Sequence, residues 1–346
     1  MKIAVYGVTG HTAGFVVAEL LRRGHTPIAI GRDEARVAAA ASLHGVELEV
    51  RIASLDSPGS LDRALSGADA VVHCAGPFLD TAQPLIEAAL RARIHYFDIT
   101  AEQGSALSTL ELFDAPARDR GVSVVPAAGF YGALGDLLAT DAMSGWGEAE
   151  RIDIAIALDS WWPTRGTRHT GRRNTAPRLV LSDGKLQQMQ PSSPASWRFS
   201  DPFGAQEVIE LPFTETILMA RHLPVREIRS YMNQAPLRDL HDPTTPGPVA
   251  ADERGRSNQR FLIDVTVRNG DEERRVTAEG RDIYAVTAPI VVEAVERVCE
   301  NRSQHAGAFA LGQLVDASDF IQTLIRNGEI VVATDRKTKG CELLRN

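Results

Sequence analysis

The sequence predicts an α/β protein with a doubly wound parallel sheet, followed by a second α+β domain with an antiparallel sheet. The first half of the 346 residues alternates short apolar strands with helices, which is typical of βαβ units. The second half contains strands in which apolar and polar residues alternate. At this length two domains are expected, at residues 1–126 and 127–281, with C-terminal helices in 282–346 that pack back on the first domain.

Six short strands and four helices are predicted for the first domain from the spacing of apolar residues. Asp33 precedes the second helix and is suited to cap it. The strands are expected at residues 3–6, 27–30, 48–52, 70–73, 95–99 and 122–125, and the helices at 12–23, 34–41, 58–65 and 81–92. Because strand–helix–strand crossovers are right-handed, these units predict a Rossmann-type sheet.

The strands predicted for the second domain bury only one face. Apolar residues alternate with polar ones at 151–159 and 259–268. The dipeptide Asn269-Gly270 then predicts a hairpin with a return strand at 274–280. Such one-sided alternation is typical of an antiparallel sheet with one covered face. The other expected elements are a mobile loop rich in Pro and Gly at 236–255 and helices at 282–300 and 317–326.

The composition excludes several classes of protein. Hydrophobic residues make up 44% and charged residues 24%, as in ordinary globular proteins, and the net charge of −8 argues against a nucleic-acid binder. No apolar run approaches the roughly 20 residues needed to span a bilayer, and no signal peptide follows Lys2. Cys74, Cys299 and Cys341 are too scattered for a disulfide framework or a metal site. We therefore expect a cytoplasmic protein without a membrane segment or a metal.

The turn after the first strand predicts a dinucleotide cofactor. Its pattern is G-x-x-G-x-x-A, in which Gly7 permits the tight turn, Gly10 lets the backbone approach the pyrophosphate, and Ala13 allows close helix–strand packing. The following helix N-terminus offers N–H groups and a favourable dipole. A turn without a ligand is the alternative. The cofactor-binding residues expected here are Gly7, Thr9, Gly10, His11, Thr12 and Ala13, with His11 using its backbone.

The end of the second strand favours NADP over NAD. NAD-binding proteins usually place an acidic residue there to hold the ribose, whereas this chain has Gly31 and Arg32. Gly31 leaves room, and Arg32 can face a 2′-phosphate. Asp33 argues weakly for NAD, but it is better used as a helix cap. The alternative for Arg32 is a solvated surface arginine.

These stretches resemble the N-terminal NADP-binding domain of saccharopine-dehydrogenase-like oxidoreductases. The resemblance rests on Gly7-Val-Thr-Gly-His-Thr12 and Gly31-Arg32-Asp33, and it extends over residues 1 to about 140. It implies an NADPH-dependent enzyme that reduces a C=N or C=C bond of a small molecule. The rival function is a non-catalytic NADP-binding sensor or scaffold. The other matching stretches are residues 74–78, 96–102 and 126–132, with weaker matches at 165–167 and 284–288.

The carboxyl ends of the predicted strands should form the site, because ligands of open α/β sheets bind there. Asp98, Glu102 and Tyr131 follow such ends and are the candidate catalytic residues. The alternatives are a turn or backbone-amide role for Asp98, a solvated carboxylate for Glu102 and a packed hinge aromatic for Tyr131. The residues Ala75, Gly76, Pro77 and Phe78 are expected to face the cofactor, and plain turn chemistry is their alternative.

The scarcity of lysine excludes one mechanism. No lysine lies between residues 3 and 184, and none of the five tyrosines is followed by a lysine four residues on. The Tyr-x-x-x-Lys pair of short-chain dehydrogenases is therefore absent, although the glycine turn is similar.

The segment from Trp161 to Arg173 is a local basic patch in an acidic chain. It contains Arg165, Arg168, Arg172 and Arg173. We expect Trp161 and Trp162 to form an apolar wall and Arg168 to clamp an anionic substrate. An interface of a homodimer is the equally weighted alternative, because Trp and Arg are also enriched at interfaces.

Overall fold

The computed structural model describes residues 1–300 and 305–338, and the chain divides into two compact units. The first unit comprises Met1–Ala133, Thr164–Thr175 and Tyr284–Val315, and the second comprises Leu134–Pro163, Ala176–Ile283 and the chain from Asp316 onward. These units differ from the expected boundaries: the first break falls after Ala133, Thr164–Thr175 belongs to the first unit, and the chain from Asp316 belongs to the second.

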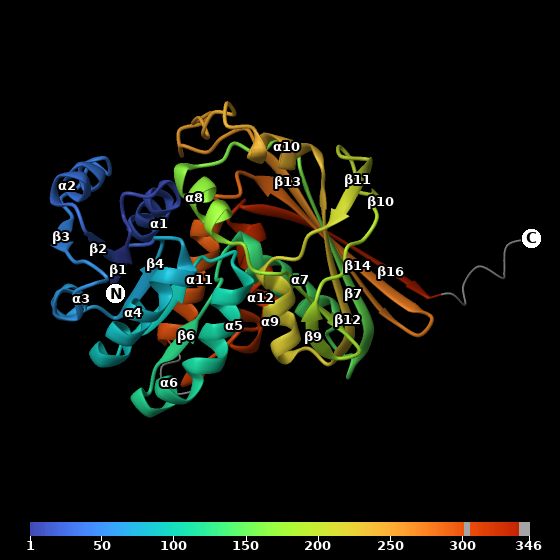
Figure 1. Ribbon diagram of the computed structural model, residues 1–346, viewed down its shortest axis with the longest axis horizontal. Coiled ribbons are helices and arrows are strands. Elements are labelled where there is room, and N and C mark those ends of the chain that lie inside the picture. Colours follow the sequence, from blue (N-terminus) through green and yellow to red (C-terminus); the bar gives the residue numbers. More distant parts are fainter. Residues whose placement is uncertain (301–304, 339–346) are drawn as a thin grey trace, which may run out of the picture. The chain divides into compact units, whose positions relative to one another are not determined.

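The described part of the first unit contains a seven-stranded parallel sheet (Figure 1). Its order is β15-β6-β5-β4-β1-β2-β3, which confirms the doubly wound fold. The six predicted strands are present, and β15 adds a seventh by pairing with β6. The strands are β1 (Lys2–Tyr6), β2 (Thr26–Gly31), β3 (Glu49–Ile52), β4 (Ala70–His73), β5 (His95–Asp98), β6 (Ser123–Val125) and β15 (Gly307–Ala308).

Two helical layers cover this sheet. Helices α1 and α11 pack on each other, and α11 also contacts β4 and β5, whereas α3, α4, α5 and α6 form the second layer. As predicted, the Asp33 side chain caps α2 by accepting the Arg36 N–H. The helices are α1 (His11–Arg22), α2 (Glu34–Ser42), α3 (Pro58–Leu65), α4 (Phe78–Ala92), α5 (Gln103–Leu112), α6 (Asp114–Arg120), α8 (Arg165–Arg173) and α11 (Thr287–Glu300).

The second unit is built on a mixed sheet, nine-stranded over the residues described. The order is β10-β11-β12-β7-β13-β14-β16, with β8 pairing β12 and β9. The expected antiparallel pairing holds for β7, β13 and β14, but β7 and β12 run parallel. The strands are β7 (Ala149–Leu158), β8 (Leu179–Ser182), β9 (Lys185–Gln188), β10 (Ala195–Arg198), β11 (Ala205–Glu210), β12 (Val225–Asn233), β13 (Arg260–Asn269), β14 (Glu272–Arg281) and β16 (Ile330–Thr338).

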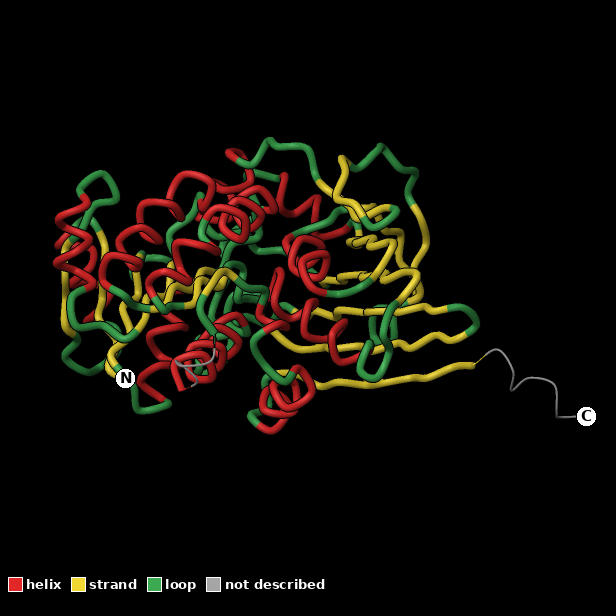
Figure 2. Tube along the Cα trace, turned by 90° about the horizontal axis from the view of Figure 1, so that it is seen from below, coloured by secondary structure: helices red, strands yellow, loops and turns green. Residues whose placement is uncertain are grey.

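The hairpin predicted at Asn269-Gly270 joins β13 to β14, and its long strands are seen in yellow in Figure 2. Helices α7 (Gly135–Ala142), α9 (Thr214–His222) and α12 (Ala317–Arg326) contact one another or the sheet. β16 pairs along β14 from Ile330 onward, which explains why the end of the chain joins the second unit. Part of the loop expected at 236–255 is helical, as α10 (Ala235–His241).

Candidate cofactor and active site

The glycine turn is shaped as the sequence predicts for a phosphate-binding loop. Gly7 has a φ of 85°, and a Cβ placed there would lie 2.6 Å from the Cβ of Ala75, so this position requires glycine. The Gly10 N–H donates to the Gly7 carbonyl at 2.9 Å. Gly10 is the N-cap of α1 and offers no side chain to its first N–H groups. These N–H groups can therefore receive an anion.

The end of β2 leaves Arg32 accessible. A Cβ on Gly31 would lie 2.7 Å from the Val37 side chain, so packing on α2 demands the glycine. Arg32 is exposed, and its charge partly offsets the rise that burial causes in the pKa of Tyr6. Asp33 caps α2, as expected. Arg32 is thus the side chain next to this strand end that could meet a phosphate.

The loop after β4 is tied down from two sides. A Cβ on Gly76 would lie 2.7 Å from the Thr170 hydroxyl of α8, so only glycine fits beneath that helix. Glu102 accepts the N–H groups of Phe78 and Leu79 at 2.7 and 3.1 Å, which places its carboxylate on the N-terminus of α4. Glu102 is fully buried, not solvated, and burial raises its pKa. The carboxylate therefore holds the predicted cofactor loop at its Phe78 end.

A buried chain of hydrogen bonds joins the loops after β4, β5 and β6. His73 Nε2 lies 3.1 Å from the Ala75 carbonyl oxygen, and Nδ1 lies 2.9 Å from the Tyr96 hydroxyl. The same hydroxyl lies 3.0 Å from Asp98 Oδ2. Asp98 Oδ1 accepts the N–H groups of Thr100 and Ala127 at 3.0 and 2.8 Å. Asp98 thus has the backbone-amide role named above as its alternative, and His73, Tyr96 and Asp98 are all fully buried.

Tyr131 lies in the loop after β6, within Phe130–Leu134, where Tyr131 (φ −79°, ψ 104°) and Gly132 (φ 122°) depart from helical geometry. Its ring is half-buried and packs edge-to-face on Phe130, with ring centres 4.9 Å apart. The Phe130 N–H donates to the Thr287 hydroxyl at 3.1 Å, which anchors this loop to the start of α11. Tyr131 is thus the least buried of the three candidate residues, although its hydroxyl is itself buried.

The part of the basic segment from Arg165 to Arg173 forms the helix α8. Its threonine face meets the cofactor loops: the Thr167 hydroxyl lies 2.9 Å from that of Tyr284, and Thr170 approaches Gly76. The Tyr284 ring packs edge-to-face on His11 of the glycine turn, at 5.5 Å. Tyr284, Thr167 and Thr170 were not expected at the site, although the weaker family matches at 165–167 and 284–288 include the first two.

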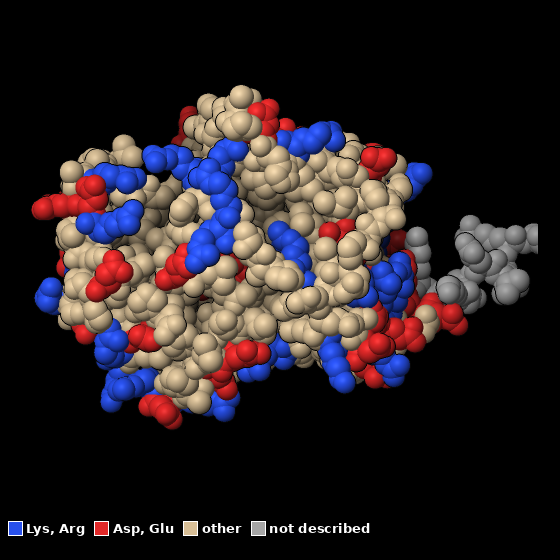
Figure 3. All heavy atoms as spheres, in the orientation of Figure 1, with Lys and Arg blue, Asp and Glu red and all other residues tan. Residues whose placement is uncertain are grey.

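The arginines of α8 lie on the other face of this helix. Arg165, Arg168 and Arg172 are spaced by three and four residues and share one stripe, whereas Thr170 is two residues from both Arg168 and Arg172. Figure 3 shows the blue atoms over α8 as a nearly continuous run. Arg173 is turned aside and binds Asp80 through two bonds of 3.0 and 2.9 Å. The stripe therefore points away from the residues that hold the cofactor loop.

Trp161 and Trp162 belong to the second unit, whereas Arg168 belongs to the first. The Trp161 side chain is buried, and its backbone N–H donates to Asp239 at 3.0 Å. Cys74 lies in the loop after β4, and Cys341 lies outside the described residues. Within residues 1–300 and 305–338, no helix is long and apolar enough to cross a bilayer, and no cluster of His, Cys, Asp or Glu suits a metal ion.

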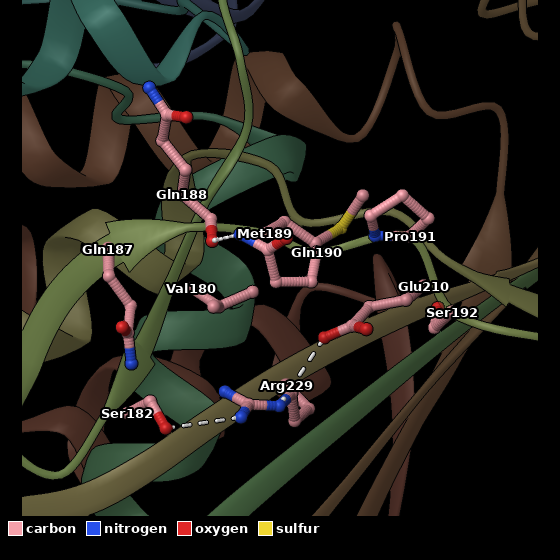
Figure 4. A pocket seen from close by; sticks show the side chains of 10 residues that line it. All are labelled: Val180, Ser182, Gln187, Gln188, Met189, Gln190, Pro191, Ser192, Glu210 and Arg229. Carbon is pink, nitrogen blue, oxygen red and sulfur yellow. Dashed lines mark hydrogen bonds and ion pairs between the residues drawn. The ribbon is translucent and has the colours of Figure 1, made fainter.

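A separate cavity of about 310 Å³ lies in the second unit, lined by β8, β9, β11 and β12 and by the residues after β9 (Figure 4). Its one arginine, Arg229, donates to the carbonyls of Leu181 and Ile228, contacts the Ser182 hydroxyl, and forms ion pairs with Glu227 and Glu210. The Nε faces Glu210 Oε1 at 3.4 Å as an ion pair without a hydrogen bond. The two carboxylates balance the charge of Arg229, so this cavity is poorly suited to an anionic substrate.

Comparison with known proteins identifies the first unit. Residues 3–122 match the family model described as the saccharopine dehydrogenase NADP binding domain. The apo saccharopine dehydrogenase (L-Glu forming) of Saccharomyces cerevisiae superposes with a TM-score of 0.67 at 12% identity, covering 97% of this chain and 100% of that one. These matches confirm the family resemblance and the fold. Residues 3–122 are therefore similar to the NADP binding domain of this family.

Curated relatives extend the match beyond this domain. The trans-acting enoyl reductase of Mycobacterium tuberculosis is 27% identical over 218 residues, which are 59% of this chain and 52% of that protein. A second protein of the same organism is 32% identical over 141 residues, 39% of this chain and 33% of its own length. The matched segments thus span a third to a half of these relatives.

Proposed function

We propose that the protein is an NADPH-dependent oxidoreductase that reduces a C=C bond of a small, anionic molecule. The observation that carries this proposal is the glycine turn with its uncapped helix N-terminus. The turn follows the carboxyl end of β1, an interior strand of the sheet, in the segment that matches an NADP binding domain. The C=N alternative named above is less favoured, because the 218-residue match to an enoyl reductase is longer than the segment 3–122 and so extends past the cofactor domain.

The chain would hold the substrate and supply one proton. When bound, the nicotinamide provides a hydride for one carbon of the double bond, so the other carbon needs a proton. Asp98 and Glu102 are both buried and engaged with backbone N–H groups. Tyr131, half-buried at the end of the sheet, is the donor that this arrangement favours.

The direct test is the oxidation of NADPH by the purified chain. We expect turnover with a 2-enoyl thioester or a 2-enoate, and none with the corresponding saturated compounds. Tyr131→Phe should lower kcat while leaving the KM for NADPH near its original value. A protein that binds NADPH tightly but oxidises it with neither enoyl compounds nor cyclic imines would instead be the sensor or scaffold.

Arg32→Ala should remove most of a preference for NADPH over NADH. Arg32 is exposed at the end of β2, and Asp33 is engaged as a helix cap. Losing one charge-assisted phosphate contact costs about 1.5–3 kcal/mol, or roughly ten- to a hundred-fold in affinity. Calorimetric titration of both cofactors into both proteins measures this. Equal affinities for the two cofactors in the unmutated protein would contradict the assignment of Arg32.

Arg168→Ala should raise the KM for the anionic substrate while leaving NADPH affinity nearly unchanged. NADPH affinity should be unchanged because the threonine face of α8, and not the arginine stripe, contacts the cofactor loops. The KM should rise because an anionic group of the substrate that extends beyond these loops would pair with the Arg168 guanidinium. An isolated surface arginine would change stability by less than about 0.5 kcal/mol and leave kinetics alone. Steady-state kinetics with sedimentation velocity measure both properties. Unchanged kinetics with an altered oligomer would assign the stripe to a homodimer interface.

A further inference from the structure

In the buried chain of His73, Tyr96 and Asp98, the number of protons decides which group donates each hydrogen bond and which accepts it. The Tyr96 hydroxyl has one proton but lies within hydrogen-bond distance of two other groups, His73 Nδ1 at 2.9 Å and Asp98 Oδ2 at 3.0 Å. It can donate to only one of them and must accept from the other. Since all three residues are fully buried, water is not at hand to supply a missing partner.

The Ala75 carbonyl fixes the direction of the chain, because a carbonyl oxygen only accepts. His73 Nε2, 3.1 Å away, must therefore carry a proton. Burial lowers the pKa of His73 to about 3, so the ring is neutral and has its one proton at Nε2. Nδ1 is then an acceptor, and the Tyr96 hydroxyl donates its hydrogen bond to it. The Tyr96 oxygen in turn needs a donor, and Asp98 Oδ2 is the atom in place.

The two oxygens of Asp98 have different surroundings, as a protonated carboxyl requires. Oδ1 accepts the N–H groups of Thr100 and Ala127, which suits the carbonyl oxygen of the acid. Oδ2 faces the Tyr96 hydroxyl. Burial, with a smaller contribution from Glu102, raises the pKa of Asp98 to about 6, although the hydrogen bonds from Ala127, Thr100 and Tyr96 oppose the rise. The Cys74 thiol is a further acidic group near this carboxyl.

We propose that Asp98 is a positioning residue, which holds a proton on Oδ2 and thereby directs the hydrogen bonds of Tyr96 and His73 so that Ala75 is held in the cofactor loop. When Asp98 loses this proton, the Tyr96 hydroxyl donates its hydrogen bond to the Asp98 carboxylate and no longer to His73. A neutral His73 can then satisfy Tyr96 only by moving its own proton to Nδ1. Nε2 is left bare against the Ala75 carbonyl, and the loop loses that anchor. The link to the cofactor rests on the proposed function; the proton assignment does not.

The sign of the pH dependence follows from the direction of the pKa shift. The pKa of Asp98 is raised by folding, so the stabilisation is complete below its unfolded value near 3.8 and is lost as the pH rises through about 6. NADP⁺ affinity should therefore fall at the higher pH. The 2′-phosphate of the probe titrates in the same range, since phosphate monoesters have a pKa near 6. The quantity to compare is therefore the ratio of the NADP⁺ affinities of the Asp98→Asn variant and the unmutated protein, measured at the same pH.

Asp98→Asn is the variant that tests the proposal, because an amide reproduces the protonated acid. Asn Oδ1 can accept from Thr100 and Ala127, and its NH₂ can donate to the Tyr96 oxygen at every pH. We expect the variant to bind NADP⁺ as tightly as the unmutated chain near pH 5. At about pH 7, one unit above the pKa, it should bind roughly tenfold more tightly than the unmutated chain. Asp114→Asn, which removes a carboxylate that holds the Ala308 N–H, is the matched control and should keep the original profile.

Two results would overturn the proposal. Parallel pH profiles for the Asp98→Asn and unmutated proteins would show that no proton on Asp98 matters. Weak binding by Asp98→Asn at all pH values would show that the carboxylate is required, with a charged His73. ¹⁵N spectra of the His73 ring settle the same point without a variant or a cofactor: a neutral ring protonated at Nε2 near pH 5 is expected, and a doubly protonated ring contradicts it. If NADP⁺ does not bind at all, the proposed function fails while these spectra still test the proton.

Discussion

Replacing Gly10 with valine is expected to abolish NADP(H) binding while the protein stays folded. A Cβ at this position would lie 3.2 Å from the Gly7 carbonyl oxygen and 3.6 Å from that of Cys74, so the rest of the valine side chain must occupy the space above the turn. That space is where a pyrophosphate would meet the N–H groups of α1. We expect an affinity loss of at least about a hundred-fold, equivalent to about 2.7 kcal/mol, by calorimetry.

Stability should change little in this variant, because Gly10 has a φ of −82° that any residue can adopt. Gly14→Ala is the matched control on the same helix. A Cβ at Gly14 meets nothing within 4 Å, so this variant should bind the cofactor normally. Binding that survives Gly10→Val would place the dinucleotide away from the glycine turn, and the family assignment would then describe the fold without the ligand.

The parallel sheet could be predicted because most of its strands, unlike β3, are buried on both faces. β1 and β4 are short apolar runs, and each ends at the turn that carries site residues. Helix α5 escaped prediction because its buried face includes Gln103, Ser105 and Thr109, which hides the apolar period. β15, only two residues long, has no pattern of its own and exists by pairing with β6.

The second unit was predicted less completely, because some of its paired strands lie far apart in the sequence. The pairing of β7 with β12 is parallel and joins residues more than 60 positions apart, so no local turn signals it. β9 (Lys185–Gln188) has almost no apolar alternation and depends on its partner β8. The hairpin at Asn269-Gly270 was predicted correctly because its turn residues specify it locally.

The candidate site shows the same division between local and long-range information. The glycine turn, Arg32 and the strand-end carboxylates were found because each follows a recognisable strand. The contact of Thr167 with Tyr284 joins residues 117 positions apart, and no local sequence pattern in either segment predicts it. The different roles of the two carboxylates could not be predicted, because both simply lie at or just after the end of the same strand in the sequence. In the structure Glu102 accepts N–H groups at the N-terminus of a helix, whereas Asp98 takes part in a chain of hydrogen bonds.

Glu102→Ala is expected to destabilise the first unit and weaken cofactor binding together. The substitution leaves the N–H groups of Phe78 and Leu79 without their acceptor at the N-terminus of α4. Each unsatisfied buried group costs about 1–3 kcal/mol, so the free energy of unfolding should fall by about 2–6 kcal/mol for the two N–H groups. Denaturant unfolding measures this loss, and NADP⁺ titration of the folded protein measures the effect on the loop. Glu111→Ala, an exposed position on α5, should stay within about 0.5 kcal/mol of the original.

Glu102→Gln separates this structural role from acid catalysis. Its amide oxygen can still accept one of the two N–H groups, whereas its NH₂ would oppose the other, so the stability should lie between that of the Ala variant and the original. A proton donor would behave differently, because kcat would collapse in the Gln variant while the free energy of unfolding and the NADP⁺ affinity stayed unchanged. Since the carboxylate already bonds two backbone N–H groups and is fully buried, we expect kcat to fall only in proportion to cofactor affinity, which leaves Tyr131 as the donor to be tested.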